Sequence, residues 1–324
     1  MEYIPIVIWV LAGIGGAALL LLLGLVFYPH RKNPLPALNT PIAIEVKTCP
    51  VPQTVEEMYL DTIKKTLTRA LVAMRYERHT INPTRKPIDS LYGAGKKLIA
   101  AKGLELVRVI PSDPLGYLES GHAASNRMED AETMIGTRQL DNLQFCITDV
   151  IQNGVPGDVL EAGVWRGGAS IFMRAVLKVY GKERRVWVAD SFEGLPNPDK
   201  KLDSYGWNAG DMAVSLEEVK ANFARYGLLD ENVRFLKGFF SDTLPNAPIG
   251  SLAVLRVDAD LYESTMDVLK ALYPRLSAGG YAVFDDYHNL PDCRKAIEEY
   301  RRAHNITEEI KTIDTRAVFW RKAS

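Results

Sequence analysis

Blocks of apolar and polar residues alternate along the second half of the chain. Short apolar runs typical of buried strands occur at 158–162, 185–189, 233–237, 252–257 and 281–284. Between and after them, apolar residues recur at helical spacing at about 168–180, 215–226, 262–273 and 291–303. Apolar strands that alternate with helices indicate a parallel sheet covered by helices on both faces.

The C-terminal end departs from this alternation. Two further strands, within ITEEIKTI and AVFWRK, are separated only by a short turn near 314–316. So short a connection requires an antiparallel pair. The sequence therefore predicts an α/β fold: a doubly wound, mostly parallel seven-stranded sheet that ends in an antiparallel hairpin, over residues 157–324.

The region before the sheet, residues 54–156, reads as helical. Thr54 and Glu57 have the spacing of a capping box, and apolar residues recur at helical spacing over 55–78. A further helix is expected over 131–152. Prolines and glycines interrupt residues 81–121, where we expect only a helix near 96–102.

The first 53 residues differ in character from the rest. Residues 3–29 carry no charged side chain, and a helix over 4–28 would be roughly 37 Å long, enough to span a bilayer core of about 30 Å. A cleaved signal peptide is the alternative, but its basic n-region is missing. We expect a transmembrane anchor over 1–32, a proline-rich tether over 33–53 and, because basic residues follow the span, a single-pass membrane protein with a cytoplasmic catalytic domain.

Composition and charge narrow the classes of partner. The chain has 324 residues, and its formal net charge of −1 argues against a nucleic-acid-binding protein. Three scattered cysteines form no metal-ligand pattern. Small residues at 12, 13, 16 and 17 are compatible with helix pairing, so a homo-oligomer is one possibility, although such residues are common in any membrane helix.

The first two strands of the sheet end in residues suited to a ligand. Glu161 and Gly163 open the turn EAGVWRGGAS, which matches neither a dinucleotide fingerprint nor a phosphate-binding loop. Asp190 ends the second strand, where an acid can accept hydrogen bonds from ribose hydroxyls, or else cap a helix. An acid in the first turn favours a cationic ligand without phosphate over NAD.

Two later strands end in paired acids. Asp258 and Asp260 follow one strand, and Asp285 and Asp286 follow the next, 27 residues after Asp258. Carboxylates packed together repel one another unless a cation neutralises them, and Mg²⁺, Ca²⁺ or Mn²⁺ prefers such oxygen ligands. Capping of the following helices would explain some of these acids. A metal here could lower the pKa of a substrate hydroxyl. His288 is either an acid–base group or a solvated loop residue.

Several long stretches together resemble the macrocin O-methyltransferase family, enzymes that methylate sugar hydroxyls with S-adenosylmethionine (SAM) and a metal. The stretches run from about Met58 to Arg321 and include LEAGVWRGGAS, ADSFEGLP, VDADLYESTMDVLKALYP and AVFDDYH. The resemblance implies a class I methyltransferase fold and Mg²⁺ on Asp258, Asp285 and Asp286. It also implies a SAM site formed by Met134, Glu161, Gly163, Trp165, Asp190, Ser191, Phe240 and Ser241.

Within that set the resemblance gives individual roles. Asp190 would bind the SAM ribose, Phe240 and Ser241 would border the adenine, and Met134 would cover the methionine end. The general base would be Asp258 or Asp260.

The functional hypothesis is a membrane-anchored SAM- and Mg²⁺-dependent O-methyltransferase. Its acceptor would be a small molecule, a glycoside or, because of the anchor, a lipid-linked glycan. The alternatives are an NAD-dependent oxidoreductase on the same fold and a tethered SAM-binding scaffold without turnover.

Overall fold

The structure is a computed structural model that describes Pro52 and residues 54–69, 74–78, 107–111, 131–180 and 183–323. The predicted membrane span, the tether up to residue 51, the small residues near 12–17 and the helix near 96–102 lie outside these residues. Within the described ranges no helix is long and apolar enough to cross a membrane. The longest of them has 16 residues, against about 20 for a span. This finding contradicts the predicted location. The prediction of a single-pass membrane protein with a cytoplasmic catalytic domain was wrong and is not proposed again.

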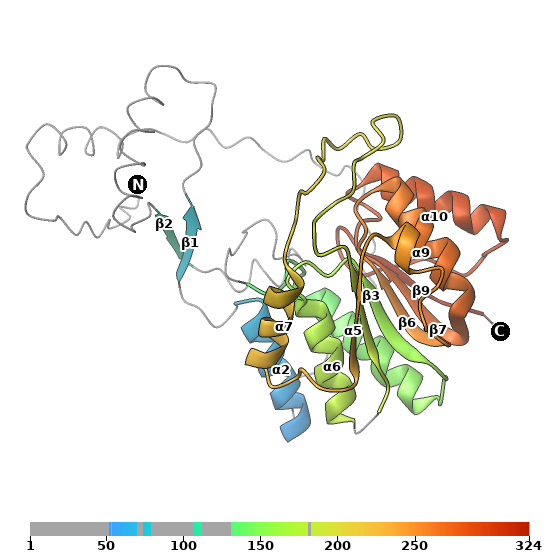
Figure 1. Ribbon diagram of the computed structural model, residues 1–324. Helices are drawn as coiled ribbons and strands as arrows, with labels where there is room; N and C mark the ends of the chain where they lie inside the picture. The colour runs from blue at the N-terminus through green and yellow to red at the C-terminus, as the bar shows by residue number, and fades with distance from the viewer. Residues whose placement is uncertain are drawn as a thin grey trace, which may run out of the picture. The chain divides into compact units, whose positions relative to one another are not determined.

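A seven-stranded sheet forms the centre of the described region (Figure 1), in the order β5-β4-β3-β6-β7-β9-β8. Its strands are β3 (Asp158–Ala162), β4 (Val186–Asp190), β5 (Val233–Lys237), β6 (Leu252–Val257), β7 (Leu276–Phe284), β8 (Lys311–Thr312) and β9 (Val318–Arg321). The strands β3 to β7 pair in parallel, and β9 runs antiparallel between β7 and β8. The predicted doubly wound sheet with an antiparallel C-terminal pair is confirmed.

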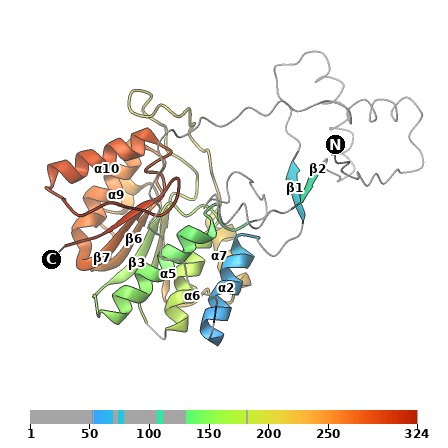
Figure 2. The same cartoon turned by 180° about the vertical axis from the view of Figure 1, so that it is seen from behind.

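Helices cover both faces of this sheet (Figures 1 and 2). One face carries α2 (Val55–Leu67), α5 (Thr137–Gln152), α6 (Gly168–Val179) and α7 (Leu216–Arg225). The other carries α8 (Phe240–Thr243), α9 (Tyr262–Leu272), a 3-10 turn (Tyr273–Arg275) and α10 (Pro291–Ala303). Successive strand residues point to opposite faces, so Val159 packs under α5 and α6 while Leu160 packs under α9.

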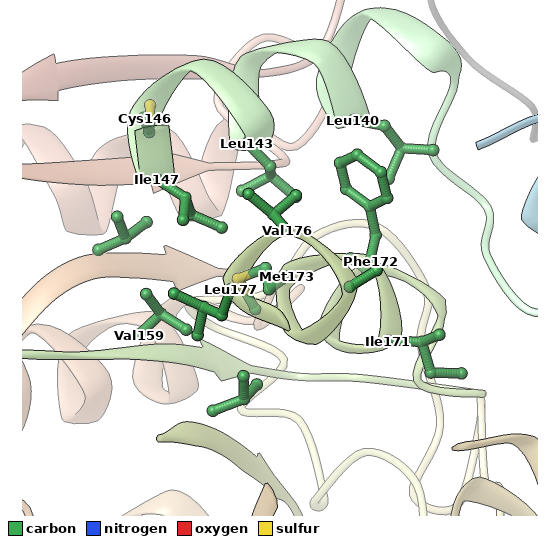
Figure 3. Close-up of a cluster of buried hydrophobic side chains, with 14 of the residues drawn as sticks. Leu140, Leu143, Cys146, Ile147, Val159, Ile171, Phe172, Met173, Val176 and Leu177 are labelled. Atoms are coloured by element: carbon green, nitrogen blue, oxygen red, sulfur yellow. The ribbon is translucent and has the colours of Figure 1, made fainter. Parts of the chain in front are cut away.

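A hydrophobic core lies between α5, α6 and the sheet (Figure 3). Leu140, Leu143 and Ile147 of α5 meet Phe172, Met173 and Val176 of α6 above Val159, and all are 0% exposed. The same core includes Leu60 and Leu67 of α2. Helices from residues 54–156 and strands from 157–324 therefore share one hydrophobic interior.

Two helices are shorter than the sequence predicts. The Thr54–Glu57 capping box is present, but α2 ends at Leu67 because Arg69 takes a left-handed conformation with φ of 56°. Residues 74–78 instead form β1 (Met74–Arg78), which pairs antiparallel with β2 (Val107–Pro111).

The second short helix is α5, which begins at residue 137 and not at 131. Tertiary hydrogen bonds explain the difference: the carbonyl of Glu132 accepts from Gly168 N at 2.9 Å, and that of Ala131 accepts from Arg166 at 3.2 Å. These bonds hold residues 131–136 across the start of α6, where they can border a ligand site.

Candidate active site

The carboxyl ends of β3, β4 and β6 open into a cavity of about 620 Å³. The chain leaves β3 and β6 in opposite directions, and ligands bind at such a switch point in open α/β sheets. The lining of this cavity contains nine of the predicted site residues: Met134, Gly163, Trp165, Asp190, Ser191, Phe240, Ser241, Asp258 and Asp260.

A smaller cavity of about 210 Å³ adjoins the first. Its lining includes Glu161 and Asp285, the other predicted residues apart from Asp286, together with Arg256 and Arg316. Asp258, Asp260, Met134 and Trp165 line both cavities. The two acids therefore stand at the boundary between a large and a small compartment.

Close backbone packing fixes the turn after β3. Gly163 has φ of 85°, and a Cβ there would lie 1.7 Å from the carbonyl oxygen of Asp258. Only glycine fits this position. The absence of a side chain lets the β3–α6 turn approach the end of β6 and brings the two strand ends to one place.

Asp190 ties the ends of β3 and β4 together. One carboxylate oxygen accepts from Val164 N at 2.8 Å, and the other accepts from Phe192 N at 2.8 Å. No helix begins at Asp190, so the capping interpretation is wrong. Burial raises the pKa of this carboxyl, and the backbone hydrogen bonds from Val164, Phe192 and Trp165 oppose that rise. The oxygen that accepts from Phe192 also lies 3.5 Å from Ser191 Oγ.

Glu161 is buried and bonded to other residues of the protein. It is 2% exposed, and its two oxygens accept from Arg256 at 2.7 Å and from Ser170 at 2.5 Å. The acid that suggested a cationic ligand in the sequence is thus paired with an arginine of the neighbouring strand.

Arg256 is the residue that the sequence reasoning missed. Its guanidinium is 1% exposed and donates to Glu161, to Asp258 at 3.0 Å and to Asp285 at 2.8 Å. A signal was available, since a lone arginine within the apolar run LAVLRV must have acidic partners if the strand is buried.

Arg316, from the turn before β9, gives the acids a second cation. It lies 2.7 Å from an Asp286 oxygen and 3.7 Å from Asp285. Two arginines thus neutralise part of the repulsion that the sequence analysis expects a metal cation to relieve. Five carboxylates against two guanidiniums still leave an excess of negative charge.

The acids that converge differ in one member from the predicted metal set. One oxygen each from Asp258, Asp260 and Asp286 lies within 4.8 Å of the other two. Asp285 is absent from that group and is bonded to Arg256 instead. The alternative that these acids cap helices is wrong, because neither α9 nor α10 has a side-chain hydrogen bond from its N-cap residue.

Burial raises the pKa of Asp258 and of Asp260 well above the ordinary value of an aspartate, and it also raises that of Asp286. For Asp258 the charge of Asp285 adds to that rise and Arg256 opposes it. For Asp260 the charges of Asp286 and Asp285 add to it. A cation bound between these carboxyls would favour their ionised forms and so lower their pKa values.

Left-handed backbone conformations concentrate here. Of six non-glycine residues with positive φ among the described ranges, three line both cavities: Trp165 at 47°, Met212 at 64° and Asp260 at 56°. Such conformations cost about 1–3 kcal/mol and are retained mostly at functional sites.

His288 lies apart from this group. Its ring nitrogen is 3.4 Å from Thr312 Oγ1, and it lines neither cavity. Burial and the charge of Arg294 lower its pKa. The acid–base interpretation of His288 finds no geometric support.

This sheet order, with a glycine turn after β3, an acid at the end of β4 and a cavity over both, corresponds to the class I methyltransferase fold. The chain belongs to the macrocin O-methyltransferase (TylF) family, which matches residues 56–322. It is a SAM-dependent O-methyltransferase, and the oxidoreductase and the scaffold without turnover are set aside.

Several proteins that are named O-methyltransferases are similar to this chain. The 8-demethyl-8-(2,3-dimethoxy-alpha-L-rhamnosyl)-tetracenomycin-C 4'-O-methyltransferase of Streptomyces olivaceus is 55% identical over 199 residues, which cover 59% of this chain and 76% of that protein. Mycinamicin III 3''-O-methyltransferase of Micromonospora griseorubida is 53% identical over 203 residues, covering 60% and 80%. The solved structure of the O-methyltransferase NovP aligns with a TM-score of 0.62 at 40% identity, covering 83% of this chain and 100% of that one.

Proposed function

We propose that this chain transfers the methyl group of SAM to a hydroxyl of a sugar ring carried by a glycosylated small molecule. The observation that carries the proposal is the pair of adjoining cavities with Asp258 and Asp260 on their common boundary. The large cavity suits SAM, and the small one suits the part of the acceptor that reacts.

The sugar acceptor is supported by the names of the relatives. The first is named for a rhamnosyl-bearing substrate, and both methylate a primed position of their acceptors. The lipid-linked acceptor rested on the membrane anchor and is not part of the proposal.

In the large cavity the described residues divide by chemistry. Asp190 and Ser191 offer oxygens to ribose hydroxyls from the end of β4, and Phe240 and Ser241 border the adenine from α8. Met134 and Trp165 lie on the boundary with the small cavity, where the methionine end of SAM would lie.

Asp260 is the base that the geometry favours. Among the described residues no group donates a hydrogen bond to its carboxylate, whereas Asp258 already accepts from Arg256 at 3.0 Å. Burial and the charges of Asp286 and Asp285 raise the pKa of Asp260, which makes its carboxylate a stronger base. SAM supplies an electrophilic methyl group. The acceptor oxygen forms a bond to that carbon as the carbon–sulfur bond breaks, and Asp260 takes the hydroxyl proton.

The acids also fit a divalent cation. Asp258, Asp260 and Asp286 present converging oxygens, and Asp286 Oδ2 is buried with no hydrogen-bond partner among the described residues. Hard oxygen ligands of this kind suit Mg²⁺. We assign Asp258 and Asp286 as its ligands, with Asp285 oriented by Arg256; bound there, Mg²⁺ would lower the pKa of the acceptor hydroxyl.

The test is turnover of the full chain with SAM, Mg²⁺ and a panel of methyl pyranosides, with catechol as a non-sugar acceptor. We expect methylated glycosides and S-adenosylhomocysteine in equal amounts. Asp260→Asn should lower kcat by about 10²–10⁴ while the affinity for SAM is unchanged, since asparagine also tolerates the left-handed conformation at this position. Asp199→Asn, in an exposed turn, is the matched control.

Transfer to catechol and to none of the glycosides would overturn the sugar acceptor. Full activity of Asp260→Asn would return the base to Asp258.

A further inference from the structure

The small cavity has a wall that the catalytic acids do not provide. Residues 196–209 leave the sheet region and return to it in one loop. Gly210 N donates to Leu195 O at 2.9 Å, and Leu195 N donates to Asp211 O at 2.9 Å. A loop whose ends are joined in this way is compact and often functional.

Two side-chain contacts fix this loop to the helices that follow the acidic strands. Asp203 accepts from Tyr262 N, at the start of α9, at 2.8 Å. Asp292, at the start of α10, accepts from both Ser204 N at 2.7 Å and Ser204 Oγ at 2.8 Å. The residues that follow Ser204 are therefore held at the rim of the site.

Those residues are an aromatic pair. The rings of Tyr205 and Trp207 have centroids 5.0 Å apart and an interplanar angle of 36°. Both line the small cavity together with Asp258 and Asp260. Tyr205 is 61% exposed, which is unusual for so large a ring.

Trp207 carries a polar atom without a partner. Its indole Nε1 is buried and makes no hydrogen bond among the described residues. A buried donor left unpaired is unfavourable, and a ligand acceptor would remove that cost. Trp207 lines the small cavity, so its indole N–H is a donor on that wall that a ligand acceptor could pair with.

The cavity's size limits what that ligand can be. About 210 Å³ is below the range of about 300–1,000 Å³ typical of drug-sized ligands. One ring fits such a space and a polycyclic or macrocyclic aglycone does not. Because Tyr205 is exposed, the aromatic pair suits a ligand whose remainder extends into solvent.

We propose that Tyr205 and Trp207 form the acceptor platform, on which the apolar face of the sugar ring packs while Trp207 Nε1–H donates a hydrogen bond to a ring substituent. The inference rests on the proposed sugar acceptor and adds the residues that select it. The platform positions one hydroxyl toward Asp260 and leaves SAM binding to the other cavity.

Steady-state kinetics of three variants of the full chain test the platform against the same methyl pyranosides. Trp207→Phe keeps the ring and removes the N–H, so KM for the glycoside should rise roughly tenfold, the effect of one lost hydrogen bond. Tyr205→Leu should also raise KM. Lys201→Ala, on the same loop but outside both cavities, is the control and should leave KM unchanged.

Two readouts separate a platform from a merely structural role. The affinity for SAM, measured by calorimetry, should be the same in all three variants. In the wild type, the indole N–H signal of Trp207, assigned by its loss in Trp207→Phe, should shift when the glycoside is added in the presence of S-adenosylhomocysteine.

The possible failures are distinct. If the wild type methylates glycosides and Trp207→Phe and Tyr205→Leu keep its KM, the platform is wrong and the proposed function stands. If the wild type neither methylates nor binds any of the glycosides, the proposed function fails and the platform falls with it.

Discussion

Arg256 donates a 2.8 Å hydrogen bond to Asp285 in a part of the site where the two side chains are 1% and 4% exposed. The same guanidinium donates to Glu161 at 2.7 Å. Charges from β3, from β6 and from the residue that follows β7 therefore meet at one arginine. The acidic strand ends can lie together before any cation binds because this arginine partly neutralises them.

Replacing Arg256 with methionine should destabilise the protein strongly. Breaking a buried ion pair from one side leaves an uncompensated charge, which costs about 3–5 kcal/mol. The free energy of unfolding in urea measures the effect. Arg294→Met breaks an exposed pair with Glu298, whose members are 52% and 40% exposed, and should cost about 1 kcal/mol or less. Similar losses in the two variants would contradict the central role of Arg256.

Magnesium should raise the melting temperature of the protein, since it binds only the folded state. Asp286→Asn should remove most of that increase together with turnover, whereas Asp260→Asn should keep the increase and lose turnover. Asp285→Asn should lower the melting temperature itself and leave the increase from Mg²⁺ unchanged. Thermal melts with Mg²⁺ and with EDTA measure these effects. A loss of the increase in Asp285→Asn would restore it as a ligand, as the family resemblance implies.

The Gly163 turn offers a test of the packing that builds the site. Gly163→Ala should destabilise the chain by several kcal/mol, because its Cβ would meet the Asp258 carbonyl and φ is positive. Gly250→Ala is the control, since nothing lies within 4 Å of its added Cβ and its φ is not in the left-handed range. Urea unfolding compares the two. Equal stabilities would mean that the β3–α6 turn can move away from β6 at little cost.

Local patterns in the sequence predicted the sheet and most of its helices because those patterns have local causes. The run LAVLRV is apolar on both faces, as a central strand covered by two helix layers requires, and the Thr54–Glu57 pair caps its own helix. Because the carboxyl ends of parallel strands lie at one edge of a sheet, the predicted ligand residues at those ends could also be expected to lie together.

What the sequence did not predict depends on partners far apart in the chain. Glu161 and Asp285 lie 95 and 29 residues from Arg256, so no spacing rule connects them. The start of α5 moved because Glu132 is bonded to the start of α6. The Tyr205–Trp207 pair lacks any regular pattern, since its loop is positioned by Asp203 and Asp292.

Asp314 is a buried acid outside the catalytic group whose charge should make stability depend on pH. One of its oxygens accepts from Arg316 N and Ala317 N at 2.8 Å each, and the other accepts from Gln139 at 3.1 Å. Burial, opposed by the backbone hydrogen bonds, raises its pKa from 3.8 to about 6.

Because this pKa is higher in the folded state than in the unfolded state, the ionised carboxylate weakens folding above pH 6, and protonation relieves that cost as the pH falls toward 4. Asp314→Asn removes the titration. Its amide can donate to Gln139 Oε1, which has no partner in the part of the chain that the structure describes, once the Gln139 side chain turns over. The free energy of unfolding of the variant minus that of the wild type should therefore rise by roughly 2 kcal/mol between pH 4.5 and 7.5.

Asp230 gives the opposite case: burial works to raise its pKa, but hydrogen bonds from Arg174 and Asn232 lower it overall. Asp230 thus stabilises the fold at neutral pH, and that contribution is lost as the pH falls through its folded-state pKa, so Asp230→Asn should be most harmful at pH 7.5. Urea unfolding across this pH range measures both differences, and slopes of the same sign would show that Asp314 is not ionised at a cost in the folded protein.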